Sequence, residues 1–104
     1  MIKELPIEQF IPSADKLILD VRDTQSYRLG HIEHAKNAPI DTLSEHLPDD
    51  TIADIYVLCG GGTKAARTCA YLDELYPSRN IIHLIGGTRG AIAHGMNIIT
   101  ESDE

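Results

Sequence analysis

The chain has 104 residues, which is the size of one common domain, and its hydrophobic fraction of 42% is ordinary for a soluble globular protein. Its formal net charge of −7 argues against nucleic acid and anionic membranes as partners, because both select basic surfaces. No signal-peptide pattern, no apolar run of about 18 residues and no CxxC motif is present, so we expect a cytoplasmic protein without a membrane span.

The first half of the chain predicts short strands separated by small helices. Residues 2–5 are an expected first strand, and residues 6–10 are an expected short helix with Pro6 at its first position. The apolar residues 17–19 predict a second strand. Asp23 or Thr24 can then cap a helix that Gly30 would end. After it we expect a loop leading into a short extended piece over 31–40, a small helix over 43–47 and a turn at 48–50.

The second half carries the clearer patterns. Residues 55–58 predict a buried strand, and a helix follows from Lys64. Its apolar residues recur at steps of 4, 3 and 4, which places them on one helical face: Ala65, Cys69, Leu72 and Tyr76. Residues 81–85 predict the last strand, and Thr88 can cap a final helix that runs to residue 94.

Alternating apolar runs and helical patterns predict an α/β domain with a mainly parallel sheet. Three of the runs stop at Asp20, Cys59 and Gly86. Ligands of open α/β sheets bind outside the carboxyl ends of the strands. We therefore expect these three positions to face one crevice.

A cysteine at the tip of the strand 55–58 is followed by three glycines and then by a helix. Successive glycines let the backbone N–H groups turn inward, and a helix N-terminus adds partial positive charge. Such a loop forms an anion-binding nest, and an electropositive setting favours the nucleophilic thiolate of a cysteine. The residues alone therefore predict a reactive Cys59 in an oxyanion-binding loop.

This loop resembles the active-site loop of the rhodanese family of sulfurtransferases. The family pattern is Cys-Arg-x-Gly-x-(Arg or Thr)-(Ser or Ala), and residues 59–65 read Cys-Gly-Gly-Gly-Thr-Lys-Ala. Residues 17–22 are similar to the family's apolar strand followed by Asp-Val-Arg. The same order continues with further matching residues, namely Tyr27, Gly30-His31-Ile32, Ala35, Asn37, Pro39 and Gly86-Gly87.

The resemblance runs from about residue 2 to residue 97 and implies a rhodanese-like three-layer domain. Its central sheet would be mainly parallel, with helices on both faces. We expect a single domain over residues 1–100 and a short acidic tail over residues 101–104.

The same resemblance implies a sulfurtransferase that needs no cofactor. The Cys59 thiolate would attack the outer sulfur of a donor, which is thiosulfate, mercaptopyruvate or a persulfide, and would become a persulfide. A thiophilic acceptor, a thiol or a protein, would then take the sulfur. The substrate-binding residues would be those of the loop, Gly60, Gly61, Gly62, Thr63 and Lys64. Asp20 and Arg22 would brace this loop by hydrogen bonds or an ion pair.

Departures from the family pattern leave alternatives open. Gly60 stands where an arginine is usual, which leaves the preference for thiosulfate open. Phosphatases of this fold have a longer loop with an arginine six positions after the cysteine, where this chain has Ala65. Loop length therefore disfavours a phosphatase or an arsenate-handling enzyme. A non-catalytic partner-binding module is the other alternative, and the retention of Cys59 counts against it.

The remaining reactive residue types favour structural roles. Cys69 could be a resolving thiol, but its place on the apolar helix face favours burial. Five histidines are present, yet no Cys, Asp or Glu accompanies them at ligand spacing, so we expect no metal site. His31, in the Gly-His-Ile stretch, is expected to be a structural hydrogen-bonding residue.

Overall fold

A five-stranded parallel sheet forms the centre of the computed structural model, which describes residues 1–46, 54–61 and 63–101 of the chain. The five strands are β1 (Ile2–Pro6), β2 (Leu17–Asp20), β4 (Ala35–Asn37), β5 (Asp54–Leu58) and β6 (Asn80–Ile85). Their order across the sheet is β1-β6-β5-β2-β4, and every neighbouring pair is parallel. Strand β5, which precedes the cysteine loop, therefore lies in the middle. This confirms the predicted mainly parallel sheet.

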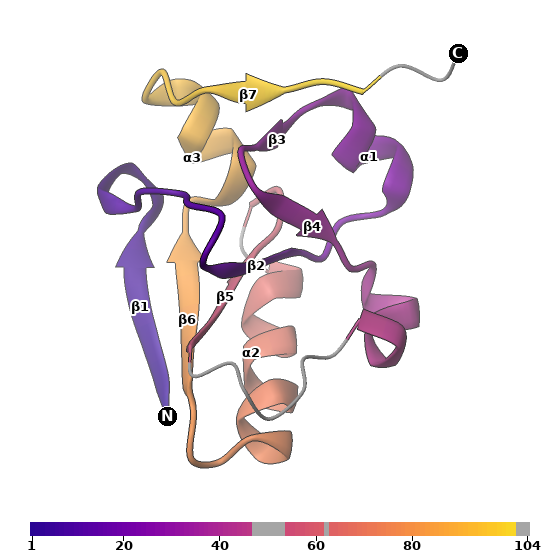
Figure 1. Cartoon of the computed structure of the whole chain (residues 1–104), viewed down its shortest axis with the longest axis vertical. Coiled ribbons are helices and arrows are strands. Elements are labelled where there is room, and N and C mark those ends of the chain that lie inside the picture. Colours follow the sequence, from indigo (N-terminus) through magenta and orange to yellow (C-terminus); the bar gives the residue numbers. More distant parts are fainter. Residues whose placement is uncertain (47–53, 62, 102–104) are drawn as a thin grey trace.

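A second, two-stranded sheet lies at the upper end of the molecule in Figure 1. There β3 (His31–Ile32) pairs antiparallel with β7 (Ile98–Ile99). The sequence predicted a loop at the position of β3 and nothing at β7. Strands of two residues are too short to show the alternation on which a sequence prediction depends.

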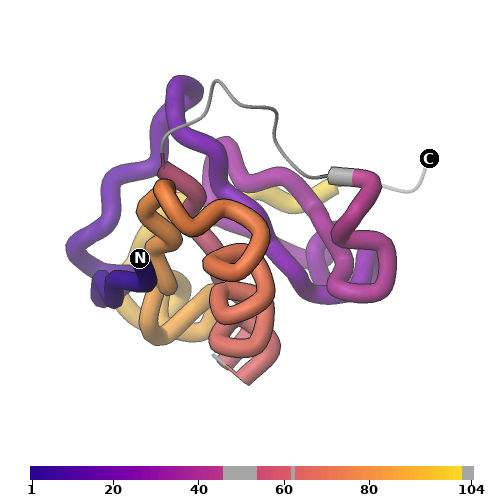
Figure 2. The backbone as a smooth tube through the Cα atoms, turned by 90° about the horizontal axis from the view of Figure 1, so that it is seen from below, coloured from indigo at the N-terminus to yellow at the C-terminus, as the bar shows by residue number. Residues whose placement is uncertain are grey.

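Helices cover both faces of the central sheet. They are the α-helices α1 (Thr24–Leu29), α2 (Thr63–Leu75) and α3 (Gly87–Ala93) and the 3₁₀ helices η1 (Ile7–Gln9) and η2 (Ile40–His46). Helix α2 runs along the sheet from its upper end downward, whereas α1 and α3 lie at the upper end (Figure 1). The N-terminus lies beside the orange segment between α2 and β6 (Figure 2), where the Met1 ammonium donates to the Arg79 carbonyl over 2.8 Å.

Alternate residues of each strand point to opposite faces, and this alternation divides the core into two clusters. The cluster on the α2 face consists of Leu19, Val21, Ala38, Leu43, Ile55, Val57, Cys59, Ala65, Cys69, Leu72 and Ile81. The cluster on the opposite face consists of Ile7, Phe10, Ile18, Ile32, Ala35, Leu58, Ile82, Leu84 and Ala91. The predicted apolar face of α2 is thus buried as expected.

Several predicted boundaries need correction. Gly86, and not Thr88, is the N-cap of α3, because its left-handed backbone (φ +96°) starts the helix two residues earlier. Pro6 ends β1 and is the N-cap of η1 rather than its first residue. Helix η2 begins at Ile40, three residues before the predicted start at 43. Its predicted end at residue 47 and the turn at 48–50 lie outside the described residues.

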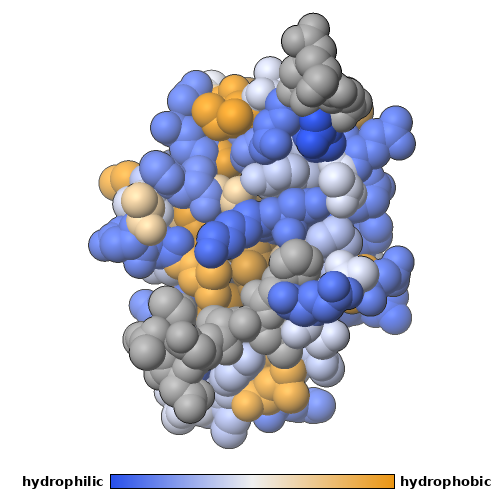
Figure 3. Space-filling model, turned by 45° about the vertical axis from the view of Figure 1, so that its right-hand side comes forward, coloured by the Kyte–Doolittle hydropathy of each residue, from blue (hydrophilic) through white to orange (hydrophobic). Residues whose placement is uncertain are grey.

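The surface is mostly polar on the face drawn in Figure 3, where hydrophobic residues show in several areas between hydrophilic ones. Within the described residues, no helix has the length and apolar character needed to cross a membrane. Glu101, the first residue of the expected acidic tail, packs onto the fold. Its backbone N–H donates to the Arg28 carbonyl (2.9 Å), and its carboxylate lies 3.4 Å from His31 Nε2.

Candidate active site

A cleft of about 440 Å³ opens at the carboxyl ends of β2 and β5. Cys59, which follows β5, lies at its base and is only 3% exposed. The cleft is lined by Arg22, Asp23, Ser26, Cys59, Gly60, Gly61, Thr63, Lys64 and Arg89. Of the three strand ends predicted to face one crevice, Cys59 lines this cleft, whereas Gly86 and the buried Asp20 do not.

The first turn of α3 holds the start of the cysteine loop. The Thr88 N–H donates to the Cys59 carbonyl over 2.9 Å, and the Arg89 N–H donates to the Gly60 carbonyl over 3.3 Å. Gly87 makes this approach possible, because a Cβ on Gly87 would lie 2.0 Å from the Cys59 carbonyl oxygen. The Gly86-Gly87 pair is therefore required for contact between the loop and α3 as well as for turning the chain.

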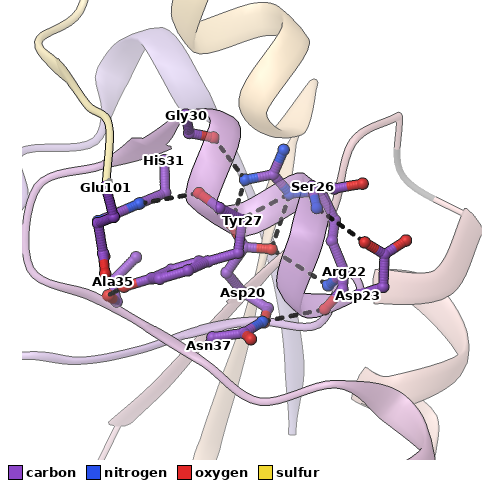
Figure 4. Close-up of polar contacts among 10 residues, drawn as sticks. All are labelled: Asp20, Arg22, Asp23, Ser26, Tyr27, Gly30, His31, Ala35, Asn37 and Glu101. Carbon is purple, nitrogen blue, oxygen red and sulfur yellow. Dashed lines mark hydrogen bonds and ion pairs between the residues drawn. The ribbon is translucent and has the colours of Figure 1, made fainter. Parts of the chain in front are cut away.

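A buried ion pair lies beside the loop, at the end of β2. The Asp20 carboxylate is fully buried, and the Arg22 guanidinium binds it through both Nε and Nη2, with an Nη2–Oδ2 distance of 2.7 Å. The same Nη2 atom donates to the Gly30 carbonyl over 2.7 Å. Figure 4 shows the guanidinium between the Asp20 carboxylate and Gly30. Because the pair is bidentate, the orientation of Arg22 is fixed.

The backbone around this ion pair is tied to both neighbouring strands. The Val21 N–H donates to the Leu58 carbonyl (3.0 Å) at the end of β5. On the other side, the Asn37 side chain donates to the Asp20 and Arg22 carbonyls over 3.3 and 3.0 Å (Figure 4). The residues that follow β2 are therefore held in place next to the residue that precedes Cys59.

His31 and Tyr27 form the outer part of this network. Their rings stack with centroids 3.8 Å apart, and His31 Nδ1 lies 3.1 Å from the Tyr27 carbonyl. The Tyr27 hydroxyl donates to the Ala35 carbonyl (Figure 4). Burial raises the pKa of Tyr27, and the Glu101 and Asp20 carboxylates raise it further. The contact between His31 Nδ1 and the Tyr27 carbonyl confirms the expectation that His31 makes structural hydrogen bonds.

Two arginine side chains flank the glycines of the loop. An ideal Cβ on Gly60 would lie 3.8 Å from Arg22 Cδ, and one on Gly61 would lie 3.7 Å from Arg89 Nη1. Arg22 was predicted from the sequence, whereas Arg89 was not. A signal for Arg89 was available, because it falls in the first turn after the Gly86-Gly87 break, at the same sheet edge as Cys59.

Asp23 and Ser26 also line the cleft without having been predicted as site residues. Asp23 is the N-cap of α1, and its carboxylate accepts from the Ser26 N–H over 2.7 Å. Hydrogen bonds from Ser26 hold the pKa of Asp23 below its ordinary value, and the charges of Lys64 and Arg22 lower it further. Among the described residues that line the cleft, Asp23 thus supplies the one carboxylate, and Arg22, Lys64 and Arg89 supply the cations.

Cys69 lies on the buried face of α2, in the same core cluster as Cys59. Burial, and to a smaller extent the neighbouring Cys59, raise the pKa of the Cys69 thiol to about 12. Both cysteines are thiols rather than halves of a disulfide. A neutral, buried Cys69 suits a packing role.

Most of the predicted site residues come together in the cleft. Cys59, Gly60, Gly61, Thr63, Lys64 and Arg22 line it, whereas Asp20 lies behind Arg22. Gly62 lies outside the described residues. Among the residues that the structure describes, no group of three or more His, Cys, Asp or Glu side chains could hold a metal ion.

The fold and the site define an α/β domain that places a cysteine at the carboxyl end of its central strand. The family model described as Rhodanese-like domain matches residues 7–94. The chain belongs to this family.

Curated relatives carry the name tRNA uridine(34) hydroxylase. The proteins from Photorhabdus laumondii and Yersinia enterocolitica are 31% and 32% identical to this chain over 94 residues. The match covers 83% of this chain but 26% of each relative. The chain therefore spans about a quarter of the length of these relatives.

Solved structures share the fold. The Rhodanese_3 like domain of a protein from Anabaena superimposes with a TM-score of 0.72 and 28% identity, over 86% of this chain and 96% of that one. A rhodanese-related protein from Thermoplasma volcanium gives a TM-score of 0.71 and 28% identity, over 84% and 86% of the two chains.

Proposed function

We propose that the protein is a sulfurtransferase that carries sulfane sulfur as a persulfide on Cys59. The observation that carries this proposal is the position of Cys59 at the base of a cleft lined by loop glycines and by three cationic side chains, Arg22, Lys64 and Arg89. Such surroundings attract an anionic donor and stabilise the negative charge of the sulfur that Cys59 then carries.

The first step transfers one sulfur atom to the protein. The thiol loses its proton to solvent, and Cys59 Sγ attacks the outer sulfur of the donor. An S–S bond forms on Cys59 while the donor's bond to that sulfur breaks. The bonding electron pair leaves with the remainder of the donor, which is sulfite from thiosulfate, a thiolate from a persulfide and the enolate of pyruvate from mercaptopyruvate.

The second step returns Cys59 to its initial state. A thiolate on a small molecule or on a protein attacks the outer sulfur of the Cys59 persulfide. The S–S bond breaks, and its electron pair returns to Cys59 Sγ. Since no net oxidation occurs, the cycle needs no cofactor.

The loop and its neighbours have distinct roles in this proposal. Backbone N–H groups of Gly60 to Lys64, at the start of the 13-residue helix α2, stabilise the anionic outer sulfur. The ion pair between Asp20 and Arg22 braces the loop through Val21 and Leu58. Lys64 attracts the anionic donor. Composition and the −7 net charge favour a cytoplasmic protein that binds no nucleic acid.

A role in tRNA uridine(34) hydroxylation is a second candidate, because the curated relatives carry that name. Those relatives are about four times as long as the matched region, so the hydroxylation would need parts that the match does not cover. The acidic charge of this chain argues that any tRNA is bound elsewhere. A partner-binding module of the same fold would fit this role as well.

Intact mass tests the main proposal. The reduced protein and Cys59→Ser are incubated briefly with thiosulfate, mercaptopyruvate and a low-molecular-weight persulfide in turn. We expect the wild type alone to gain one sulfur atom and to lose it again on addition of cyanide or a thiol. No uptake from any donor by an accessible, reduced Cys59 would favour the partner-binding module. Turnover of an aryl phosphate would instead revive the phosphatase alternative.

A further inference from the structure

We infer that Arg89 is the residue that selects the sulfur donor, by binding an anionic oxygen group on the part of the donor that leaves. This inference rests on the proposed sulfur transfer at Cys59 and names a specificity determinant for it. The group recognised is a sulfonate or a carboxylate, and the experiments below distinguish the two.

The position of Arg89 follows from the backbone contacts of α3. Its N–H donates to the Gly60 carbonyl, and the preceding N–H, from Thr88, donates to the Cys59 carbonyl. The Cα of residue 89 is therefore fixed beside the loop. Its guanidinium reaches over the glycines, since Nη1 lies 3.7 Å from the position that a Cβ on Gly61 would occupy. With Gly61 lacking a side chain, nothing at that residue blocks a ligand from this guanidinium.

The charges of the cleft single out Arg89 among its three cations. Arg22 is neutralised by the buried Asp20, with an Nη2–Oδ2 distance of 2.7 Å. Lys64 faces the Asp23 carboxylate, which interacts electrostatically with both Lys64 and Arg22.

Arg89 lacks such compensation among the residues that the structure describes. Within residues 1–46, 54–61 and 63–101, no carboxylate lies within ion-pair distance of its guanidinium. Its side chain is also exposed to solvent on the cleft wall, so an incoming ligand can reach it. Among the three cations, Arg89 is therefore the one whose charge a neighbouring carboxylate offsets least, while Lys64 keeps part of its charge for an incoming anion.

This arrangement suits a donor with two separate features. The outer sulfur must reach Cys59 at the base of the cleft, while an anionic oxygen group lies higher, over Gly61. A guanidinium presents paired N–H donors that match the oxygens of a sulfonate or a carboxylate. Thiosulfate and mercaptopyruvate both have this form, whereas an uncharged donor would gain nothing from Arg89.

Kinetics with paired donors test the inference. Thiosulfate is compared with methanethiosulfonate, which transfers the same outer sulfur but carries one negative charge fewer. Mercaptopyruvate is compared with its uncharged methyl ester. The variants are Arg89→Met, Arg89→Lys and the matched control Arg67→Met, which removes an exposed arginine from α2 that lines a different cavity.

For Arg89→Met, we expect KM for the preferred fully charged donor to rise about tenfold, because one charge-assisted interaction is lost. The value of kcat should stay nearly unchanged. The charge-reduced partner of that donor should show a much smaller rise, and Arg89→Lys should recover part of the loss. The donor pair with the larger difference identifies a sulfonate or a carboxylate as the group bound. Equal effects on charged and uncharged donors, or no effect on either, would overturn the inference.

A binding measurement separates this inference from the sulfur transfer itself. Thiosulfate is titrated into Cys59→Ser, which cannot form a persulfide, with and without Arg89→Met. A Kd about tenfold weaker without Arg89 supports the anion-binding role even if the wild type takes up no sulfur. An unchanged Kd overturns it even if the wild type is an active sulfurtransferase.

Discussion

Gly87 and Cys59 are in closer contact than any other residue type at position 87 would allow. A Cβ on Gly87 would lie 2.0 Å from the Cys59 carbonyl oxygen and 2.9 Å from that of Gly60, and Gly87 has φ +56°. We expect Gly87→Ala to abolish sulfur uptake by Cys59, because backbone atoms of the loop would have to move. Intact mass after incubation with thiosulfate measures this loss.

Gly95→Ala is the matched control for that substitution. Gly95 also has a positive φ, of +74°, but a Cβ there would meet nothing within 4 Å. Conformational strain alone should cost it about 1 kcal/mol of unfolding free energy and leave sulfur uptake intact. If Gly87→Ala proved no more harmful than Gly95→Ala, the close contact between α3 and the loop would be wrong.

The ion pair between Asp20 and Arg22 leads to a prediction on stability. Asp20→Asn leaves a guanidinium that is mostly buried without its carboxylate, and we expect a loss of about 3–5 kcal/mol in unfolding free energy. Sulfur uptake should also slow at temperatures where the variant is folded, since the loop loses its brace. Urea unfolding and timed intact mass measure the two effects.

A surface pair provides the comparison. The Met1 ammonium lies 2.6 Å from Asp73, whose side chain is 36% exposed. Water screens this pair, so Asp73→Asn should cost about 1 kcal/mol or less and leave sulfur uptake unchanged. A double-mutant cycle of Asp20→Asn with Arg22→Met should show strong coupling. Additive effects would mean that the buried pair does not act as a unit.

The sequence was sufficient to predict the central features of the fold and the site. Strong apolar runs marked β2, β5 and β6, and their ends placed Asp20, Cys59 and the Gly86-Gly87 break at one edge of the parallel sheet. Of these, Cys59 lines the cleft and the others do not. These predictions succeeded because buried strands and a glycine-rich loop follow from local chemistry. Hydrophobic spacing likewise identified the buried face of α2.

What the sequence did not reveal depends on contacts between distant segments. The place of Arg89 after the Gly86-Gly87 break puts it at the sheet edge of Cys59, but its proximity to the loop depends on the packing of α3 against residues 59 and 60, about 30 positions earlier in the sequence. Strands β3 and β7 pair through only two residues each, with His31 opposite Ile99, and two residues are too few to give a local sequence pattern. Thr88 looks like a helix cap, but the positive φ of Gly86 moves the start of α3. The misses at Arg89 and at β3 and β7 thus reflect tertiary contacts, whereas the miss at Thr88 reflects a local backbone conformation.

Cys69 gives a prediction on pH. Its thiol has a pKa of about 12 in the folded protein, above the ordinary value of 9.0. The folded state therefore holds a proton that the unfolded state releases, so this contribution to stability is fully present below about pH 9 and is lost as pH rises toward 12. We expect the unfolding free energy to fall less steeply between about pH 9 and pH 12 in Cys69→Ala than in the wild type.

The same variant tests whether Cys69 has a redox role. Cys69→Ala should take up sulfur at the wild-type rate, and native Cys69 should resist alkylation until the protein is unfolded. Tyr27 and Tyr56, whose pKa values are also raised by burial, remain in both proteins and contribute equally to the pH dependence. Loss of persulfide turnover in Cys69→Ala would instead make Cys69 a resolving thiol.

Asp23 gives a prediction on donor affinity that follows from the proposed sulfur transfer. Its carboxylate lines the cleft and opposes the approach of an anion. An asparagine can still accept the Ser26 N–H, so Asp23→Asn removes the charge and keeps the helix cap. We expect KM for thiosulfate to fall about twofold at low salt, with the difference shrinking as ionic strength rises.

Asp15→Asn is the control for this prediction. Asp15 lies at the opposite end of β2 and lines a separate cavity, so this variant should leave KM unchanged. A fall in KM that persisted at high salt, or that appeared equally in Asp15→Asn, would show that the effect does not come from the field of Asp23 within the cleft.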